Sequence, residues 1–438
     1  MKGLKLSLMV LTATMLALGL SGMAYAFHSG GVAACDGCHT MHGIYTTGSS
    51  TPAFAGKGPN LLVATDPSST CLLCHAAPPA GSPNIGGGPR VMTYPFPGAG
   101  IAPAGFNVGG DFAWLQKRFQ TSTSGAGTFE EGQTHGHNVI AADFGMLADP
   151  DFPGLSPGGN FSTNILACNS CHDPHGTYRR VGNNTSYQVG TPTQLGVNSL
   201  PISGSGSKGA APVPGVSAVG TYRLLAGLGY LQGGTGGTPT NFPGVPIAVS
   251  PSTSGGTETT PSTQFRVAYA NVTTNGVVPW GQWCGACHSQ MMSSNASTHK
   301  HPVDVPLSGR GINAIYDSYV ATGNPNGTNA TSFLSLVPFM ESQTDIGILT
   351  NHIATGYVVG PASTDQVSCL SCHRGHASGF KFALRWDMAD QFLTNPTGWE
   401  VQNHGRSLAE ANQSYMGRPF TYFPPNQRVL CNKCHMKD

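Results

Sequence analysis

The chain has 438 residues, only 9% of them charged, and its 21 basic and 20 acidic side chains almost cancel. The 60 glycines and 33 prolines exclude a protein built mainly from long helices or one large sheet, because both residue types interrupt regular structure. Taken alone, so much Gly and Pro with so few charges would favour disorder.

The N-terminal segment has the pattern of a secretory signal peptide. An apolar run over residues 6–20 follows two lysines, and Ala-Tyr-Ala at 24–26 resembles a cleavage site. The run is short for a membrane-spanning helix, and no later segment is long and apolar enough to cross a bilayer. We therefore predict that residues 1–26 are cleaved and that residues 27–438 form the mature, exported protein.

The pattern Cys-x-x-Cys-His occurs six times and uses all 12 cysteines. Two thiols at this spacing add to the vinyl groups of one haem, and the next histidine binds its iron from the proximal side. Disulfides, zinc sites and a thioredoxin-like motif do not require a histidine after every pair. The sequence thus predicts six covalently bound haem c groups. The attachment cysteines are Cys35, Cys38, Cys71, Cys74, Cys168, Cys171, Cys284, Cys287, Cys369, Cys372, Cys431 and Cys434, and the proximal histidines are His39, His75, His172, His288, His373 and His435.

Six haems change what the composition predicts. Each buried macrocycle supplies apolar surface, so a mostly irregular, loop-rich chain with a few short helices can wrap around a continuous haem chain. Removal of two lysines with the signal peptide lowers the formal net charge from +1 to −1, and about two propionates per haem make the holoprotein more acidic. Nucleic acid is therefore not an expected partner.

The motifs are unevenly spaced, so they do not form a tandem repeat. Residues 182–262 are mostly Gly, Ser, Thr, Pro and Val, which predicts irregular surface loops, either as an ordered coating or as a solvated linker. Periodic apolar residues predict short helices near 111–120, 312–319, 382–392 and 408–416. We expect one continuous domain over residues 27–438.

Six irons need six distal ligands. Ten histidines remain after the proximal six: His28, His42, His135, His137, His175, His299, His301, His352, His376 and His404. This surplus favours bis-histidine ligation and low-spin, low-potential iron, whereas a methionine ligand would raise the potential. Methionine from position 41, 291 or 292 remains the alternative at a single haem.

Three motifs are followed by another histidine at the third position, namely His42 after His39, His175 after His172, and His376 after His373. The second histidine lies on the same side of its own haem as the proximal ligand, so it cannot easily reach the distal face. If it binds iron, it should bind the iron of a neighbouring haem. The alternative is a hydrogen bond to a propionate or a place at the surface. Three such pairs favour closely packed haems.

Several segments, in order from one mature end to the other, carry a recognisable pattern. They are residues 27–31 leading into 35–42, Gly109-Gly110-Asp111-Phe112, residues 168–180 with CHDPHG and YRR, Arg266-Val267-Ala268-Tyr269, Trp283-Cys284, residues 369–380 with CHRGHASGF, and residues 430–435. These segments resemble the outer-membrane cytochrome S family of hexahaem cytochromes from metal-reducing bacteria, whereas the loops between them differ.

The resemblance implies a homopolymeric, conductive extracellular filament with a chain of haems stacked in alternating parallel and perpendicular pairs. It implies that His42 crosses the subunit boundary and binds the fifth haem of an adjacent protomer. The distal ligands that it favours are His28, His42, His137, His175, His301, His352 and His376. Because seven histidines are favoured and only six distal ligand positions exist, one of these histidines must have another role.

The predicted function is extracellular electron transfer at the outer cell surface, from other cytochromes to acceptors such as metal oxides or electrodes. A monomeric periplasmic or secreted electron shuttle is the alternative, and the residues alone do not separate the two. A haem reductase needs an open iron position, and the Cys-x-x-Cys-Lys motif of nitrite reductases does not occur here. We therefore predict an electron carrier without substrate turnover.

Overall fold

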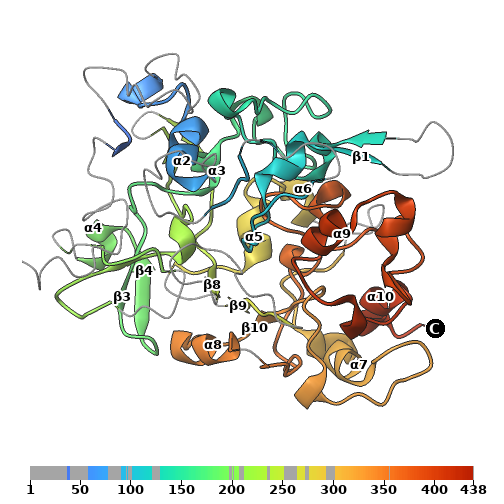
Figure 1. Cartoon of the computed structure of the whole chain (residues 1–438). Helices are drawn as coiled ribbons and strands as arrows, with labels where there is room; N and C mark the ends of the chain where they lie inside the picture. Colours follow the sequence, from blue (N-terminus) through green and yellow to red (C-terminus); the bar gives the residue numbers. More distant parts are fainter. Residues whose placement is uncertain are drawn as a thin grey trace, which may run out of the picture.

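The computed structural model describes residues 37–39, 58–76, 90–94, 96, 101–120, 129–196, 200, 202–206, 212–233, 237–250, 264–271, 276–292, 301–354 and 356–437. Loops connect short helices and small sheets throughout these residues (Figure 1). Among the described helices, none combines the length and the apolar character that crossing a membrane requires. The loop-rich fold with a few short helices is therefore confirmed.

Local capping explains where the short helices begin. At α2, Asp66 accepts a hydrogen bond from the backbone N–H of Ser69 at 2.8 Å, and Pro67 occupies the first helical position; both features favour a helix N-terminus. At α9, Ser407 and Glu410 form a capping box. The α-helices are α2 (Pro67–His75), α3 (Cys168–Cys171), α4 (Pro192–Leu195), α5 (Trp280–Gly285), α6 (Ser289–Met292), α7 (Ile312–Ser318), α8 (Ile346–His352), α9 (Leu408–Ser414) and α10 (Arg428–His435).

Single turns of 3-10 helix occur between these elements. Such turns need few residues and tolerate the nearby glycines and prolines. They are η2 (Pro59–Leu61), η3 (Phe112–Gln116), η4 (Gly132–His135), η5 (Ala142–Phe144), η6 (Thr163–Ile165), η7 (Tyr222–Leu224), η8 (Leu307–Arg310), η9 (Asn329–Thr331), η10 (Cys369–Ser371), η11 (Lys381–Ala383), η12 (Glu400–His404) and η13 (Phe420–Tyr422).

The described strands form sheets of two or three strands. Antiparallel pairs join β1 to β2, β6 to β7 and β11 to β12, and β3 lies between β4 and β5. The central strand β9 pairs antiparallel with β8 and parallel with β10, where Met340 lies opposite Tyr269. The strands are β1 (Arg118–Gln120), β2 (Phe129–Glu131), β3 (Arg179–Gly182), β4 (Tyr187–Gly190), β5 (Val219–Gly220), β6 (Leu231–Gln232), β7 (Thr238–Pro239), β8 (Ile247–Val249), β9 (Ala268–Ala270), β10 (Met340–Glu341), β11 (Thr394–Asn395) and β12 (Gly398–Trp399).

Apolar side chains gather in several clusters rather than in one layer. In the C-terminal part, α7 and α10 pack together (Figure 1), and the indole of Trp399 stacks on the ring of Tyr415 with centroids 3.6 Å apart. Cys372 and Cys434 pack against the same cluster. Two attachment motifs therefore lie directly against the aromatic core.

The periodicity predicted two of the four helices correctly. The elements α7 and α9 coincide with the segments 312–319 and 408–416. Residues 111–120 instead form η3 followed by β1, and residues 382–392 are irregular after η11. Phe382 has a φ of +59°, and a left-handed residue cannot continue a right-handed helix.

The stretch 182–262 was predicted as irregular surface loops, and this was wrong for much of its described part. Val189, Val219, Val245 and Ile247 are buried, and β8 pairs with the central strand β9. Isolated Val and Ile residues between Gly and Ser positions can fill a small sheet without producing an alternating pattern. The described part therefore agrees with an ordered coating rather than with a solvated linker.

Candidate functional site

Several attachment motifs begin on a single helical turn. Cys71 and Cys74 lie in α2, and Cys168 and Cys171 are the two ends of α3. Residues three apart on a helix share one face, so the two thiols of a motif can reach the two vinyl groups of one haem. The described cysteines form no disulfide.

The motifs contact one another in their order along the chain. The thiols of Cys71 and Cys168 are hydrogen-bonded to each other, and those of Cys284 and Cys369 are hydrogen-bonded in the same way. Electrostatic interactions join Cys38 to Cys71, Cys171 to Cys287, and Cys372 to Cys434. Each motif thus lies near the next, with direct contact from the second to the third and from the fourth to the fifth, and the attachment sites form one row from the first to the sixth.

Backbone carbonyls hold many of the candidate ligand histidines. In each case Nδ1 bonds to a carbonyl oxygen, which can only accept, so the ring proton lies on Nδ1 and the lone pair of Nε2 is free for a metal. The bonds join His39 to Asn60 at 2.9 Å, His172 to Arg223 at 2.8 Å, His288 to Pro157 at 2.7 Å, His373 to Phe382 at 2.8 Å, His137 to Gly375 at 3.0 Å, and His376 to Gly110 at 3.3 Å.

Three of these carbonyls belong to the same kind of turn. Asn60, Arg223 and Phe382 have φ values of +58°, +43° and +59°, and the residue after each is also left-handed. A leucine follows, and its backbone bridges to the histidine: Leu62 to His39, Leu225 to His172, and Leu384 to His373. These are the three motifs with a third-position histidine. One structural unit therefore occurs three times, although the sequence has no tandem repeat.

Four of the motif histidines face a second histidine ring. The ring centroids lie 6.3 Å apart for His39 and His175, 6.3 Å for His172 and His376, 6.1 Å for His288 and His137, and 6.1 Å for His435 and His301. A metal–imidazole bond is about 2.0–2.1 Å long, so two rings on opposite sides of one metal have centroids roughly 6 Å apart. In each pair the separation leaves room for one iron.

Two of these pairs come from the third-position histidines. His175 follows the third motif but faces the first motif's His39, and His376 follows the fifth motif but faces the third motif's His172. In both cases a third-position histidine faces the histidine of a different motif, which is the geometry that ligation of a different haem would require. Two motifs are joined at each of these positions.

The protein environment keeps two of the facing imidazoles neutral. Burial, with a smaller effect of His288, lowers the pKa of His137 to about 4, and burial, with His172, lowers the pKa of His376 to about 3. Neutral imidazole is the form that binds a metal. The residue His137 nevertheless keeps part of its surface accessible to solvent.

Two glycines let the backbone approach the ring of His376. A Cβ on Gly109 would lie 2.6 Å from the imidazole, and a Cβ on Gly110, where φ is +91°, would lie 1.6 Å from the carbonyl oxygen of Ala377. The imidazole also stacks on Phe112 at 4.6 Å. In the sequence, residues 109–112 stood out only as one of the segments that carry the resemblance. The sequence did not reveal that they position His376.

Two of the other histidines pair with carboxylates. His135 is buried, and its Nε2 lies 2.6 Å from the carboxylate of Glu130, while Nε2 of His404 lies 3.1 Å from Asp390. The resemblance favoured neither residue as an iron ligand. Their carboxylate partners agree with that prediction.

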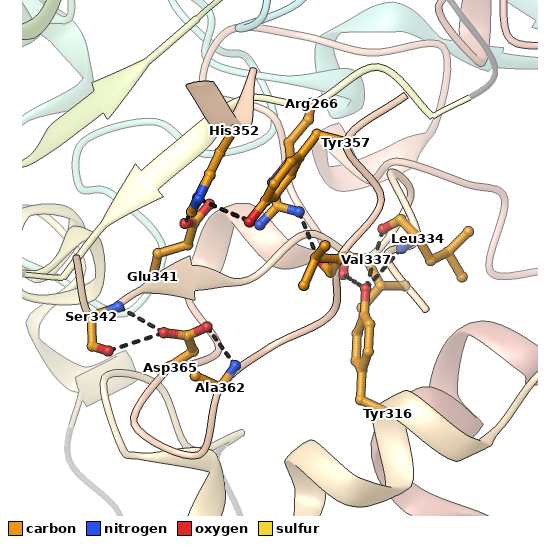
Figure 2. Close-up of polar contacts among 11 residues, drawn as sticks. Arg266, Tyr316, Leu334, Val337, Glu341, Ser342, His352, Tyr357, Ala362 and Asp365 are labelled. Atoms are coloured by element: carbon orange, nitrogen blue, oxygen red, sulfur yellow. Dashed lines mark hydrogen bonds and ion pairs between the residues drawn. The ribbon is translucent and has the colours of Figure 1, made fainter. Parts of the chain in front are cut away.

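His352 also lies in a side-chain network, which Figure 2 shows. Its Nδ1 bonds to Glu341 at 2.5 Å, and its Nε2 bonds to the hydroxyl of Tyr357 at 2.8 Å. Arg266 donates to the other oxygen of Glu341 at 2.8 Å. Burial raises the pKa of Glu341, but His352 and Arg266 outweigh burial and leave that pKa below its ordinary value. Both ring nitrogens of His352 are thus engaged within the protein.

Some predicted site residues lie outside the described residues, namely Cys35, His28 and His42, together with the signal peptide. The described motif residues fit haem c by the chemistry of their donor atoms. Pairs of described thiols that form no disulfide lie in the same motifs as imidazoles, and four pairs of rings have the separation that one iron requires. The two remaining motif histidines, His75 and His373, end the second and fifth motifs.

The chain is similar in sequence and in structure to known cytochromes over almost its whole length. The chain is 39% identical to the C-type cytochrome OmcS of Geobacter sulfurreducens, and the alignment covers 100% of both chains. Its structure resembles the outer membrane cytochrome S filament from that organism, with a TM-score of 0.73 and 37% identity over 94% of this chain and 100% of the other. The cryo-EM structure of OmcS nanowires matches with a TM-score of 0.74 and 36% identity over the same shares. No protein-family model matches the chain.

Proposed function

This chain belongs to the family of the c-type cytochrome OmcS, and we propose that it is the subunit of an extracellular, electron-conducting filament of identical chains. Its six motifs carry six haem c groups, whose irons take up and release single electrons. The observation that carries the proposal is the set of four histidine pairs with centroids 6.1 to 6.3 Å apart.

We infer six bis-histidine sites, four of them from these pairs and two from the histidines that remain. The proximal and distal ligands are His39 with His175, His172 with His376, His288 with His137, and His435 with His301. We exclude His352, the seventh candidate, as a distal iron ligand, because Glu341 and Tyr357 form hydrogen bonds with its two ring nitrogens. His28 is then the partner of His75, and His42 serves the iron bound through His373.

A continuous path for electrons follows from the row of attachment sites. The thiols of successive motifs contact one another from the second motif to the third and from the fourth to the fifth. Because each cysteine fixes one edge of a macrocycle, neighbouring haems lie close together in chain order. The protein holds their spacing through short helices and through backbone bonds to the histidines.

The path leaves the subunit through His42. This residue is the third-position histidine of the first motif, and the corresponding residues of the third and fifth motifs both face a different motif. With residues 27–438 as one exported domain, His42 reaches the fifth haem of an adjacent protomer. The link between subunits is then the same kind of link that joins the motifs within one chain.

Export by the signal peptide places this filament outside the cell or at its outer surface. Other cytochromes supply electrons, and extracellular acceptors such as metal oxides or electrodes receive them. With two histidines on every iron, no coordination position is open for a substrate. The protein is therefore an electron carrier and not an enzyme.

The test is the variant His42→Ala, with Met41→Leu as the neighbouring control. The His42→Ala protein should keep its haem content but remain as discrete particles in electron micrographs of the secreted fraction, whereas Met41→Leu should form normal filaments. Normal filaments from His42→Ala would contradict the bridging role. Discrete monomers from the unmodified protein under all conditions would instead support the soluble electron shuttle.

A further inference from the structure

Asp387, Asp390 and His404 form a cluster in which one possible ligand atom from each residue lies within 4.8 Å of the others. None of the three belongs to a Cys-x-x-Cys-His motif or to a facing histidine pair. Asp387 and Asp390 precede the hairpin of β11 and β12, and His404 ends η12 just after it. The hairpin therefore brings the three side chains together from two sides of one loop.

The carboxylate of Asp390 is buried without full compensation. Its side chain is only 5% exposed, and one oxygen lies 3.1 Å from Nε2 of His404. The other oxygen, Oδ2, is buried and has no hydrogen-bond partner among the described residues. A buried, unsatisfied carboxylate oxygen is costly, and its environment points to a bound cation.

The charges around Asp390 increase this cost. Burial and the neighbouring carboxylate of Asp387 raise the pKa of Asp390 to about 6. The imidazole of His404 and the guanidinium of Arg406 act in the opposite direction on the pKa of Asp390, but the hydrogen bonds of Arg406 go to the carbonyl oxygen of Gly379 and to the hydroxyl of Ser414. A metal ion beside Oδ2 would supply the missing positive charge.

We propose that Asp387, Asp390 and His404 bind one divalent first-row transition-metal ion, with Zn²⁺ as the best-fitting example. Two carboxylates and one imidazole are donors that Zn²⁺ accepts, whereas Mg²⁺ and Ca²⁺ prefer oxygen alone. Ligand atoms bonded to tetrahedral Zn²⁺ at about 2.0–2.2 Å lie roughly 3.3–3.6 Å apart. The three ligand atoms lie within 4.8 Å of one another, so binding requires small side-chain movements of up to about 1 Å that draw them together around the ion.

The ion would have a structural role. Asp387 and His404 are partly exposed, so an ion can enter from solvent and keep water as its remaining ligand. Bound there, it ties the segment before β11 to the end of η12. The hairpin between them carries Trp399, which stacks on Tyr415 in the aromatic core beside Cys372 and Cys434. The metal would therefore stabilise the part of the fold that supports the last two attachment sites.

The experiment uses the complete holoprotein, treated with a chelator and then titrated with Zn²⁺. The variants are Asp390→Asn and His404→Gln, and the control is Glu131→Gln, which removes an exposed carboxylate paired with Arg118. Calorimetry and metal analysis should give about one tight Zn²⁺ per chain in the wild type and in the control. Even the loss of a residue behind a ligand weakens metal binding 10–100-fold, so both cluster variants should weaken it at least about 100-fold.

A second readout keeps the test independent of folding defects. Zn²⁺ should raise the thermal unfolding midpoint of the wild type and the control but not that of either variant, and all four proteins should keep the same haem absorbance. The proposal is overturned if the wild type takes up no tight Zn²⁺, or if both cluster variants bind it as tightly as the control. These measurements count metal per chain, so their outcome does not depend on filament formation.

Discussion

Two regions of the molecule place histidines in opposite chemical settings. Along the row of motifs, Nδ1 of rings such as His172 and His376 bonds to a backbone carbonyl, and Nε2 faces another imidazole. In the network of Figure 2, both nitrogens of His352 bond to side chains, one to Glu341 and one to Tyr357. Both regions are partly buried, and the resemblance favoured histidines in both as iron ligands.

The difference between them lies in what each hydrogen-bond partner does to the ring. A backbone carbonyl orients an imidazole and fixes its tautomer without adding a charge, so the free nitrogen stays available to a metal. A carboxylate beside one nitrogen and a hydroxyl on the other instead make the ring part of an ion-pair network. A carboxylate on Nδ1 is itself compatible with metal binding, so the access to Nε2, which Tyr357 engages in His352, separates the two groups of histidines better than the sequence around them.

The largest effect should come from the row of motifs itself. Replacing Cys168 and Cys171 together by Ala should remove about one haem per chain, because the thiols are the covalent attachment. It should also destabilise the fold, since Cys171 packs against buried aromatic residues. Mass spectrometry and a pyridine haemochrome assay measure the loss. The single variant His352→Gln is the control and should keep all its haems.

The variant His376→Ala should change one iron without removing its haem. Loss of a facing imidazole leaves an open axial position, so about one haem per chain should show a high-spin ferric signal in electron paramagnetic resonance. The variant His352→Gln should remain fully low-spin. A high-spin signal from His352→Gln but not from His376→Ala would mean that His352 binds iron and His376 does not, the opposite of what we expect.

The network around His352 should matter for stability rather than for ligation. Arg266→Met leaves the buried Glu341 without its guanidinium partner, and breaking a buried pair in this way costs about 3–5 kcal/mol. Denaturant unfolding should show this loss, while the absorbance of the low-spin haems stays unchanged. A spectral change equal to the loss of one ligand would mean that the network is part of the haem row.

The same network should respond to acid in a defined direction. Because the folded-state pKa of Glu341 is lowered from its ordinary value of 4.5, its ionisation stabilises the fold above that value, and this stabilisation is lost as the pH falls through the lower folded-state pKa. The stability difference between wild type and Glu341→Gln should therefore be full at neutral pH and shrink below about pH 4.5. A difference that grows on acidification would contradict this role.

The smallest effect should come from the left-handed turn behind His373. The side chain of Phe382 is 56% exposed, so its replacement removes little packing. Phe382→Val places a β-branched residue at a φ of +59°, which should cost about 1–2 kcal/mol. Loosening the bond from Nδ1 of His373 should also raise the potential of that haem. Glycine adopts a positive φ easily, so the variant Phe382→Gly should keep the wild-type potential of the haem bound through His373 in a redox titration.

Sequence reasoning predicted the chemistry of the site more completely than its geometry. The motif cysteines and histidines are recognised because covalent attachment requires a fixed spacing along the chain. The third-position histidines His175 and His376 could be assigned to other motifs because a ring plane blocks the path to their own distal face. The role of Gly109 could not be predicted, since its close contact is with a ring 267 residues later in the chain.

The sequence by itself determined the class of cofactor and the loop-rich character of the fold, and it predicted the positions of attachment, because each depends on residues close together in the chain. The tertiary structure decided which histidine faces which, how the three left-handed turns recur, and why His352 belongs to an ion-pair network. These features depend on contacts between distant segments. A backbone carbonyl, a carboxylate and a second imidazole are all possible partners of a histidine, and only folding brings one of them within hydrogen-bond or metal-ligand distance.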